Sequence, residues 1–463
     1  MIVANNLSGL TKVFLGNESI AQVYYGSNLV WPIEPSSIPM KLIFTTYMDE
    51  EISLGCTHQG TILPNTSTPQ PNYVLTNSEV LDLCYDNGAN EKIFTSITIG
   101  DCVTNISNSA FKLNNIFVGK NFQSLKNIKE ITIGNSVTEI GEESFYPVDG
   151  TYWENLTGIT LSNNLQTIGK NAFFGRRSVR NFVFPNSLVT IGEGAFSDCV
   201  SANFYFNSSI KTIGKSAFSN CESMQNITIP NSTTSLGEAA FQNCIGATVL
   251  SIGSGLKTIN SNTFANCISL NRIDVPDNVL YIKDTVFDVC TSASAATIGS
   301  GCKEIGNGLF NGCKNLQNVV FANGSETSTI GNYTFNECRK LTSVTFSNTL
   351  YTIGDYTFKG CMELTEVVYP DSIYSIGIQQ FYDNYSVKSI TIGSGCRIIG
   401  GNDVIFRCTS YTCKAVVPPM LNGSLVFGEG VDYKIYVPSE SVEDYKAANG
   451  WSNYADHIFP ITE

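Results

Sequence analysis

Cysteine is the residue type in this sequence whose side chain could most readily bind a metal ion or act as a nucleophile. The chain has 15 cysteines but only two histidines, His58 and His457, which stand far apart in the sequence. Zinc sites usually combine closely spaced cysteines with histidines, and nucleophilic catalysis needs a base beside the thiol or hydroxyl. The cysteines stand singly, without the C-x-x-C spacing. The sequence therefore predicts no zinc site, no Cys-His or Ser-His pair, and no enzyme.

Eight of the cysteines share one position, three residues after a repeated phenylalanine. They are Cys199, Cys221, Cys244, Cys267, Cys290, Cys313, Cys338 and Cys361. A free thiol in such a pattern behaves as a small buried hydrophobic group, so we expect a packing ladder. The other seven are Cys56, Cys84, Cys102, Cys302, Cys396, Cys408 and Cys413. A disulfide between Cys408 and Cys413 is an alternative for that pair.

Three glycine-rich turns and several acidic residues are further candidates for ligand binding. Gly-Ser-Gly occurs at 253–255, 299–301 and 393–395, and backbone amides in glycine-rich loops can bind phosphate. Each, however, replaces the Pro-Asn-Ser turn of neighbouring units, which favours a structural turn. Glu50, Glu51 and the scattered aspartates lack the spacing of a calcium loop. A calcium ion bound at the surface is the alternative. We expect no cofactor and no metal.

The phenylalanines define the elements that position these residues. Successive members lie mostly 22 or 23 residues apart and give thirteen units: Phe111, Phe145, Phe173, Phe196, Phe218, Phe241, Phe264, Phe287, Phe310, Phe335, Phe358, Phe381 and Phe406. Five residues before most of them stands an isoleucine followed by glycine, as in Ile191-Gly192. A period of this length is typical of a solenoid of stacked units.

One unit shows the expected local structure. Residues 224–230 alternate apolar and polar side chains like a half-buried strand, which Pro230 ends. Residues 235–237 form a second, short extended piece, and we expect residues 238–244 to form one or two helical turns. One unit cannot bury its own apolar face, so the units must stack. The predicted fold is a solenoid, mainly β with short helical turns, of about 13 repeats of roughly 23 residues.

The order Leu-x-x-Ile-x-Ile-Pro, Ile-Gly and Ala-Phe-x-x-Cys resembles the BspA-like leucine-rich repeats, also called the Treponema pallidum type. The resemblance covers roughly residues 93–413, and residues 435–438, 441–446 and 451–458 resemble the end of many such arrays. It implies a leucine-rich-repeat solenoid and a role in surface attachment. Members look like bacterial and protozoan adhesins, related arrays occur in bacteriophage proteins, and there are no family-wide catalytic residues to carry over.

The chain divides into five predicted segments. Residues 1–34 form an N-terminal β-hairpin module, 35–39 a Pro/Ser linker, 40–92 an N-terminal β cap region, 93–413 the repeat array, and 414–463 a C-terminal cap. In the last segment we expect a helix over 442–448 with Ser441 as its N-cap. The first module weakly resembles anchoring segments of phage proteins, and its anchoring residues would be Val13, Leu15, Tyr24, Tyr25 and Trp31. A simple cap on the next domain is the alternative.

The long strands offer the expected binding surface. Their outward side chains are Asn226, Thr228, Arg272, Asp274, Asn318, Val320, Ser343, Thr345, Glu366 and Val368. This set is polar and mixed, which suits a carbohydrate or a protein. The alternative at each position is an ordinary solvated strand residue.

Charge and hydropathy bear on the partner. A net charge of −13 without a cluster of Lys or Arg argues against nucleic acid and anionic lipid. No apolar stretch reaches the roughly 18 residues that a membrane helix needs. Residues 1–6 lack the features of a signal peptide, and free cysteines fit synthesis in a reducing compartment.

Two functions follow from these observations. The first is a bacteriophage virion component, a tail or head fibre or a decoration, that binds other virion proteins through its N-terminal module. Its solenoid would bind a host surface protein or glycan. The alternative is a cell-surface leucine-rich-repeat adhesin of a commensal or parasitic microbe. The N-terminus without a leader favours the virion component. An enzyme-regulating scaffold is a third possible function. The chain could form a homo-oligomer in any of these roles.

Overall fold

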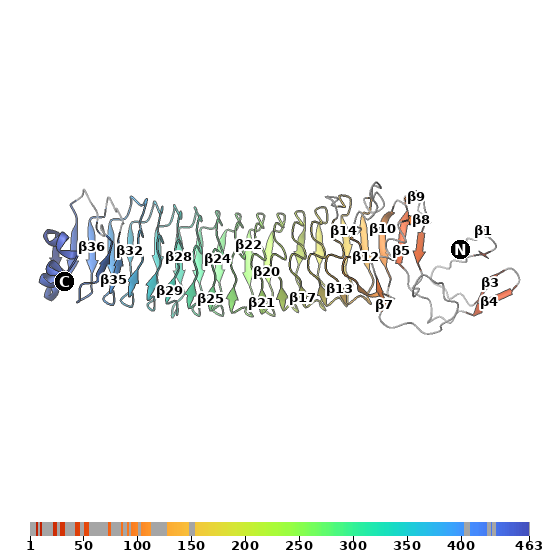
Figure 1. Cartoon of the computed structure of the whole chain (residues 1–463), viewed down its shortest axis with the longest axis horizontal. Coiled ribbons are helices and arrows are strands. Elements are labelled where there is room, and N and C mark those ends of the chain that lie inside the picture. The colour runs from red at the N-terminus through yellow and green to blue at the C-terminus, as the bar shows by residue number, and fades with distance from the viewer. Residues whose placement is uncertain are drawn as a thin grey trace.

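The structure is a computed structural model of the whole chain. It describes residues 94–100, 103–112, 127–147, 153–401, 408–423, 427 and 432–462, and the strand backbone of earlier segments. Within these residues the chain winds into stacked coils that follow one another along a straight rod (Figure 1). The predicted solenoid of units of about 23 residues is confirmed.

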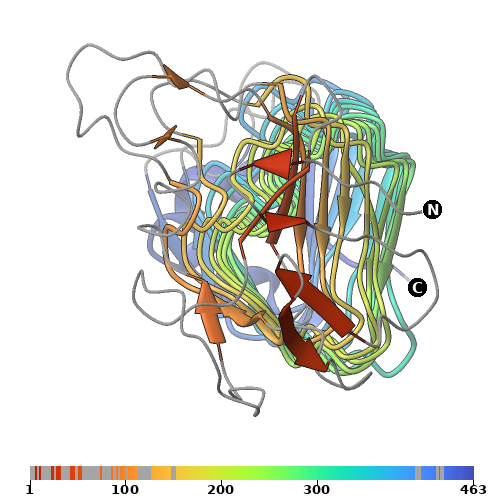
Figure 2. The same cartoon turned by 90° about the vertical axis from the view of Figure 1, so that its right-hand side faces the viewer.

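Each coil contributes one long and one short strand, and these belong to separate parallel sheets on different sides of the coil (Figure 2). The long strands are β10 (Phe94–Ile99), β12 (Glu130–Ile133), β14 (Gly158–Thr160), β16 (Asn181–Val183), β18 (Asn203–Tyr205), β20 (Asn226–Ile229), β22 (Val249–Ile252), β24 (Arg272–Val275), β26 (Ala295–Ile298), β28 (Asn318–Phe321), β30 (Ser343–Thr345), β32 (Glu366–Val368), β34 (Ser389–Ile392), β36 (Ser410–Cys413) and β38 (Lys434–Val437).

The short strands are mostly two residues long. They are β7 (Tyr73–Leu75), β11 (Val103–Ile106), β13 (Glu139–Ile140), β15 (Thr167–Ile168), β17 (Thr190–Ile191), β19 (Thr212–Ile213), β21 (Ser235–Leu236), β23 (Thr258–Ile259), β25 (Tyr281–Ile282), β27 (Glu304–Ile305), β29 (Thr329–Ile330), β31 (Thr352–Ile353), β33 (Ser375–Ile376), β35 (Ile398–Gly400) and β37 (Met420–Asn422). Their isoleucines pair in register from coil to coil, as Ile305 does with Ile330.

A stack of phenylalanine rings forms the centre of the core. Twelve of the thirteen predicted rings, from Phe111 to Phe381, stack on the next one with centroids 4.8 to 6.0 Å apart. All twelve are buried. Phe406 lies outside the described residues. Since each ring touches the rings before and after it, the core is continuous through the array.

The segment around each phenylalanine is not helical, contrary to the expectation for residues 238–244. Ala239 and Asn243 have φ of 55° and 61°, in the left-handed region. The backbone N–H groups of Ala239, Phe241 and Asn243 donate to carbonyls of the next coil at 2.9 Å. A helix would need these donors for its own i−4 carbonyls. The segment is therefore a run of turns whose hydrogen bonds join coils.

The Ile-Gly pairs mark a corner where neighbouring coils come close together. A Cβ on Gly192 would lie 2.6 Å from the backbone carbon of Gly169 in the preceding coil, and a Cβ on Gly377 would lie 2.5 Å from that of Gly354. These distances are too short for any side chain. The glycine is therefore required by the approach of the coils.

Strands at the two ends extend or cover the sheets. The remaining N-terminal strands are β1 (Asn6–Leu7), β2 (Leu10–Thr11), β3 (Gln22–Tyr25), β4 (Asn28–Pro32), β5 (Leu42–Thr46), β6 (Glu51–Leu54), β8 (Tyr85–Asp86) and β9 (Asn90–Glu91). Strands β3 and β4 pair antiparallel, as expected of a hairpin. Strand β5 pairs antiparallel with β10 and so continues the long-strand sheet beyond the first parallel strand.

The C-terminal end combines further strands with short helices. Both parallel ladders continue past residue 413, because β38 pairs with β36 and β37 pairs with β35. After β38 come η1 (Ser439–Ser441), α2 (Val442–Ala447), η2 (Trp451–His457) and β39 (Ile458–Pro460). Ser441 stands at the N-cap of α2, as predicted, but its side chain makes no capping hydrogen bond. Trp451 and Tyr445 are fully buried beneath this cap.

Candidate functional site

The cysteine ladder is a hydrogen-bonded part of the core. In all eight ladder positions, from Cys199 to Cys361, the thiol donates to the carbonyl of the phenylalanine in the preceding coil, with S to O distances of 3.1 to 3.4 Å. Burial raises the pKa of Cys199 and of Cys313 to about 12. These thiols stay protonated at neutral pH, so they are poor nucleophiles.

The cysteines outside the ladder that the structure describes are free and buried as well. Cys408 and Cys413 are not joined, which rules out the alternative disulfide in this structure. The Tyr445 hydroxyl lies 3.3 Å from the Cys413 sulfur and donates to the Ala415 carbonyl at 2.7 Å. Cys56, Cys84 and Cys102 lie outside the described residues.

The Gly-Ser-Gly turns use their central amides internally. The N–H of Ser254 donates to Asn231, that of Ser300 to Asp277, and that of Ser394 to Asp371, at 2.7 to 3.0 Å. The hydrogen bond from Ser300 lowers the pKa of Asp277. A phosphate would have to displace a carboxylate or carboxamide that already occupies each of these donors. The arrangement fits a structural turn.

The described residues offer little for metal or acid–base chemistry. In this part of the chain no three His, Cys, Asp or Glu side chains lie close enough to hold a metal ion. His457 stacks on Tyr433 with ring centroids 4.1 Å apart, and its Nδ1 lies 3.0 Å from the Tyr433 carbonyl. His58 and Glu50 are among the residues that are not described, and for Glu51 only the backbone of strand β6 is described.

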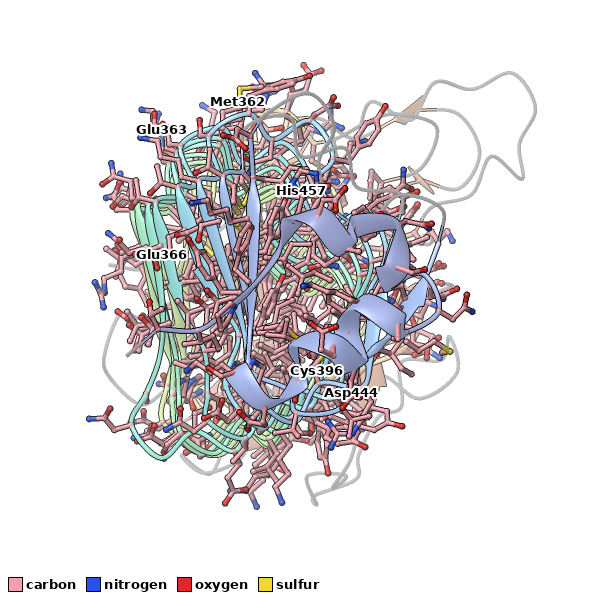
Figure 3. All side chains as sticks on the ribbon, turned by 90° about the vertical axis from the view of Figure 1, so that its left-hand side faces the viewer. Met362, Glu363, Glu366, Cys396, Asp444 and His457 are labelled. Atoms are coloured by element: carbon pink, nitrogen blue, oxygen red, sulfur yellow. The ribbon has the colours of Figure 1, made fainter. Side chains whose placement is uncertain are left out.

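The outward side of the long strands is the surface best suited to binding. We call it the long-strand face. All ten predicted outward residues, from Asn226 to Val368, are exposed, whereas inward neighbours such as Ile227, Ile273 and Val319 are buried. Figure 3 shows Glu366 projecting from this side, with Met362 and Glu363 at the turn before it. Parallel pairing in register aligns these side chains in columns, and successive side chains within a column lie about 4.8 Å apart.

The columns of the long-strand face differ in chemistry from coil to coil. Arg272 pairs with Asp274 on its own strand at 2.7 Å and donates to the Thr297 hydroxyl of the next strand at 2.9 Å. Apolar side chains occur among the polar ones, and Val183 and Tyr205, 67% and 56% exposed, are partners on adjacent strands. The face is therefore a mixed surface with fixed charges and exposed apolar groups.

Two features of the array escaped the sequence analysis. Arg176 occupies the ladder position one coil before Cys199, is fully buried, and lies over the Trp153 ring at 4.9 Å. Burial lowers its pKa to about 10. Stacked tyrosines occur near the C-terminal end of the array. Arginine at the position that holds cysteine in the next eight units was a visible signal for the first feature. Tyrosines spaced 23 residues apart were the signal for the second.

The predicted anchoring residues cannot be placed in a site. Val13 and Leu15 lie outside the described residues, and for Tyr24, Tyr25 and Trp31 only the strand backbone is described. Among the described residues, no helix is long and apolar enough to cross a bilayer.

Solved protein structures were compared with this chain. Three solved structures are similar to this chain at low sequence identity. One from Bacteroides ovatus is 19% identical, with a TM-score of 0.45, over 82% of this chain and 97% of that one. The pneumococcal vaccine antigen PcpA is 21% identical, with a TM-score of 0.42, over 73% and 79% of the two chains. A leucine-rich cell surface protein from Faecalibacterium prausnitzii is 20% identical, with a TM-score of 0.38, over 68% and 88%.

A comparison with curated protein sequences gave no match. The family model for the BspA type leucine-rich repeat region, in contrast, matches overlapping segments at residues 85–149, 116–221, 150–250, 234–328 and 327–422. These segments cover most of the chain and coincide with the stacked coils. The chain therefore belongs to the BspA type leucine-rich-repeat family.

Proposed function

We propose that this protein is a non-enzymatic recognition protein that binds a macromolecule at a microbial cell surface through its long-strand face. One observation carries the proposal: inward residues of the long strands are uniformly apolar, while the exposed residues beside them change from coil to coil. Core packing accounts for the inward set only. The exposed set is free to match a partner.

The geometry of this face supports binding to an extended partner. The long strands follow one another along a straight rod (Figure 1), and pairing in register aligns their outward side chains. A protein surface or a glycan chain can therefore contact several coils at once. Isolated exposed groups such as Val320 and Val368, 46% and 49% exposed, supply apolar contact. The pair formed by Arg272 and Asp274 supplies fixed charges that give orientation and specificity.

The virion role stays a prediction from the sequence. It depends on anchoring by residues 1–34, whose side chains are not described. The adhesin role depends on the array, whose fold and family are established. The adhesin is therefore the function we propose, and a cell-surface or extracellular location goes with it.

Substitution of the face tests the proposal. Full-length protein with Thr228→Arg, Val320→Glu and Val368→Glu is compared with the wild type for binding to bacterial and epithelial cells by flow cytometry. The matched control is Ser235→Glu, which changes an exposed residue of the short-strand sheet. We expect the triple variant to lose at least roughly tenfold in affinity while the control binds normally. Equal binding by both variants would refute the role of the long-strand face.

A further inference from the structure

Two stacked pairs of tyrosines lie in neighbouring coils; Tyr333, Tyr351 and Tyr374 are exposed, and Tyr356 is partly buried. Tyr333 and Tyr356 have ring centroids 4.8 Å apart and an interplanar angle of 4°. Tyr351 and Tyr374 have centroids 4.9 Å apart and an angle of 13°. Tyr351 and Tyr356 lie on either side of β31 in the same coil. We call these four residues the tyrosine platform. It borders the short-strand sheet, which is separate from the long-strand sheet.

One end of each stack leaves an aromatic face uncovered. The residue aligned with Tyr333 in the preceding coil is Gly308, which has no side chain to cover the ring. The atoms within 4 Å of a Cβ on Gly308 belong to Thr285 and Asn311, and none belongs to Tyr333. Among the described residues, Tyr356 is the one aromatic or cationic group that contacts the Tyr333 ring, and Tyr333 is 41% exposed.

The second stack is open in the same direction. Tyr351 aligns with Ser328 of the preceding coil, since its N–H donates to the Ser328 carbonyl at 2.8 Å. The Ser328 hydroxyl is directed away from Tyr351, because it donates to the Lys303 carbonyl one coil further back. Tyr351 is 50% exposed. Both stacks therefore end in an open ring face toward the N-terminal side.

Neutral hydrogen-bonding groups lie between the two open rings. The hydroxyls of Thr329 and Thr352 lie 3.4 Å apart on β29 and β31. The Asn332 side-chain oxygen accepts from the N–H of Asp355 at 2.7 Å, and the other half of this carboxamide is an N–H donor. A ligand above the rings meets hydroxyls and a carboxamide.

We propose that the tyrosine platform binds a neutral polysaccharide, with one pyranose ring stacked on the open face of Tyr333 or Tyr351. The face of an aromatic ring is electron-rich and attracts the weakly positive C–H groups on one side of a sugar ring. The threonine hydroxyls and the carboxamide suit sugar hydroxyls. The net charge of −13 and the nearby Asp355 disfavour an acidic polysaccharide. The site is independent of the long-strand face.

Tyrosine is suited to this role for an energetic reason. A Tyr side chain has few rotatable bonds, so ordering it on binding costs little entropy. Each ring is already held in place by its stacking partner in the next coil. The outer ring is consequently presented in the orientation that a stacked ligand needs.

Native affinity gel electrophoresis of the full-length protein tests the proposal. The gels contain dextran, xylan, mannan or a β-glucan, with polygalacturonate as the acidic comparison. We expect at least one neutral polysaccharide to retard the wild type. Tyr333→Ala combined with Tyr351→Ala should weaken that interaction roughly tenfold or more. The corresponding phenylalanine substitutions should preserve it, because they keep the ring.

Two further variants sharpen the test. Ser328→Leu covers the open face of Tyr351 with an aliphatic side chain that has no ring of its own, and it should also reduce retardation without removing either tyrosine. Tyr205→Ala, which changes an exposed tyrosine of the long-strand face, is the matched control and should bind normally. Melting curves confirm that each variant is folded.

The outcomes separate this proposal from that for the long-strand face. Retardation that survives the double alanine change, retardation by polygalacturonate alone, or no retardation by any neutral polysaccharide would each overturn the platform. The triple long-strand variant should migrate like the wild type in these gels. Its loss of cell binding is therefore measured independently of the platform.

Discussion

At the scale of single residues, the ladder cysteines link side-chain chemistry to coil stacking. Each thiol fills core volume and donates to a phenylalanine carbonyl of the preceding coil, which also accepts from a backbone N–H of its own coil. Burial raises the pKa of Cys313 to about 12, from an ordinary value of 9.0. The thiol form is thereby favoured in the folded state. The same preference makes the stability of the array dependent on pH.

We expect the free energy of unfolding to fall as the pH rises above 9. Cys313 in the unfolded chain loses its proton near pH 9, while the folded chain keeps it until about pH 12. Its contribution is fully present below pH 9 and is lost between these values. Cys313→Ser keeps a donor to the Phe287 carbonyl but does not ionise in this range. Urea unfolding at pH 8, 9 and 10 measures the free energy of unfolding at each pH. Its decrease with pH should be smaller in the variant than in the wild type, by up to about 1.4 kcal/mol per pH unit. Identical slopes would contradict the assignment.

At the scale of elements, the Ile-Gly corner controls how closely the coils approach. We expect Gly192→Ala to destabilise the protein by about 3 kcal/mol, because its Cβ would meet the backbone of Gly169 at 2.6 Å. Gly158→Ala is the matched control, since the nearest atom to its Cβ would be a flexible Glu130 carbon at 3.7 Å. It should change stability by less than about 0.5 kcal/mol. Thermal and urea unfolding measure both. Equal effects would show that the corner can relax.

At the scale of the whole molecule, the rod is a chain of nearest-neighbour contacts. Every coil bonds to the coil before it and the coil after it, and the phenylalanine stack runs through the same contacts. Stability in such an array is local, because a coil has no contact with distant coils. A substitution that disrupts one coil should therefore destabilise the adjacent coils before distant ones.

Phe264→Ala tests this locality. Loss of a fully buried ring should cost about 3 to 5 kcal/mol by forming a cavity. In hydrogen exchange, amides in the coils of Phe241 and Phe287 should lose protection, while those near Phe173 should keep theirs. A uniform loss along the rod would instead indicate one cooperative unit. Thr228→Ala, at an exposed position, serves as the control.

The sequence alone predicted the coil and its inward side. The spacing of phenylalanines and the alternation of Ile227 and Ile229 are local patterns, and they correctly identified the core and the exposed positions of the long strands. The cysteine ladder was also predicted as packing. Its hydrogen bonds were not, because each thiol and its acceptor carbonyl lie 25 to 28 residues apart in sequence.

Features that depend on neighbouring coils were decided by the tertiary structure. The segment 238–244 has the composition of a helical turn, but its amides bond to the next coil, and inter-coil bonding outweighs local helical preference. The tyrosine platform likewise depends on which residue stands one coil away: Gly308 and Ser328 leave ring faces open. The sequence by itself determined what one coil contains. Stacking determined what each side chain meets, because those contacts join residues about 23 positions apart.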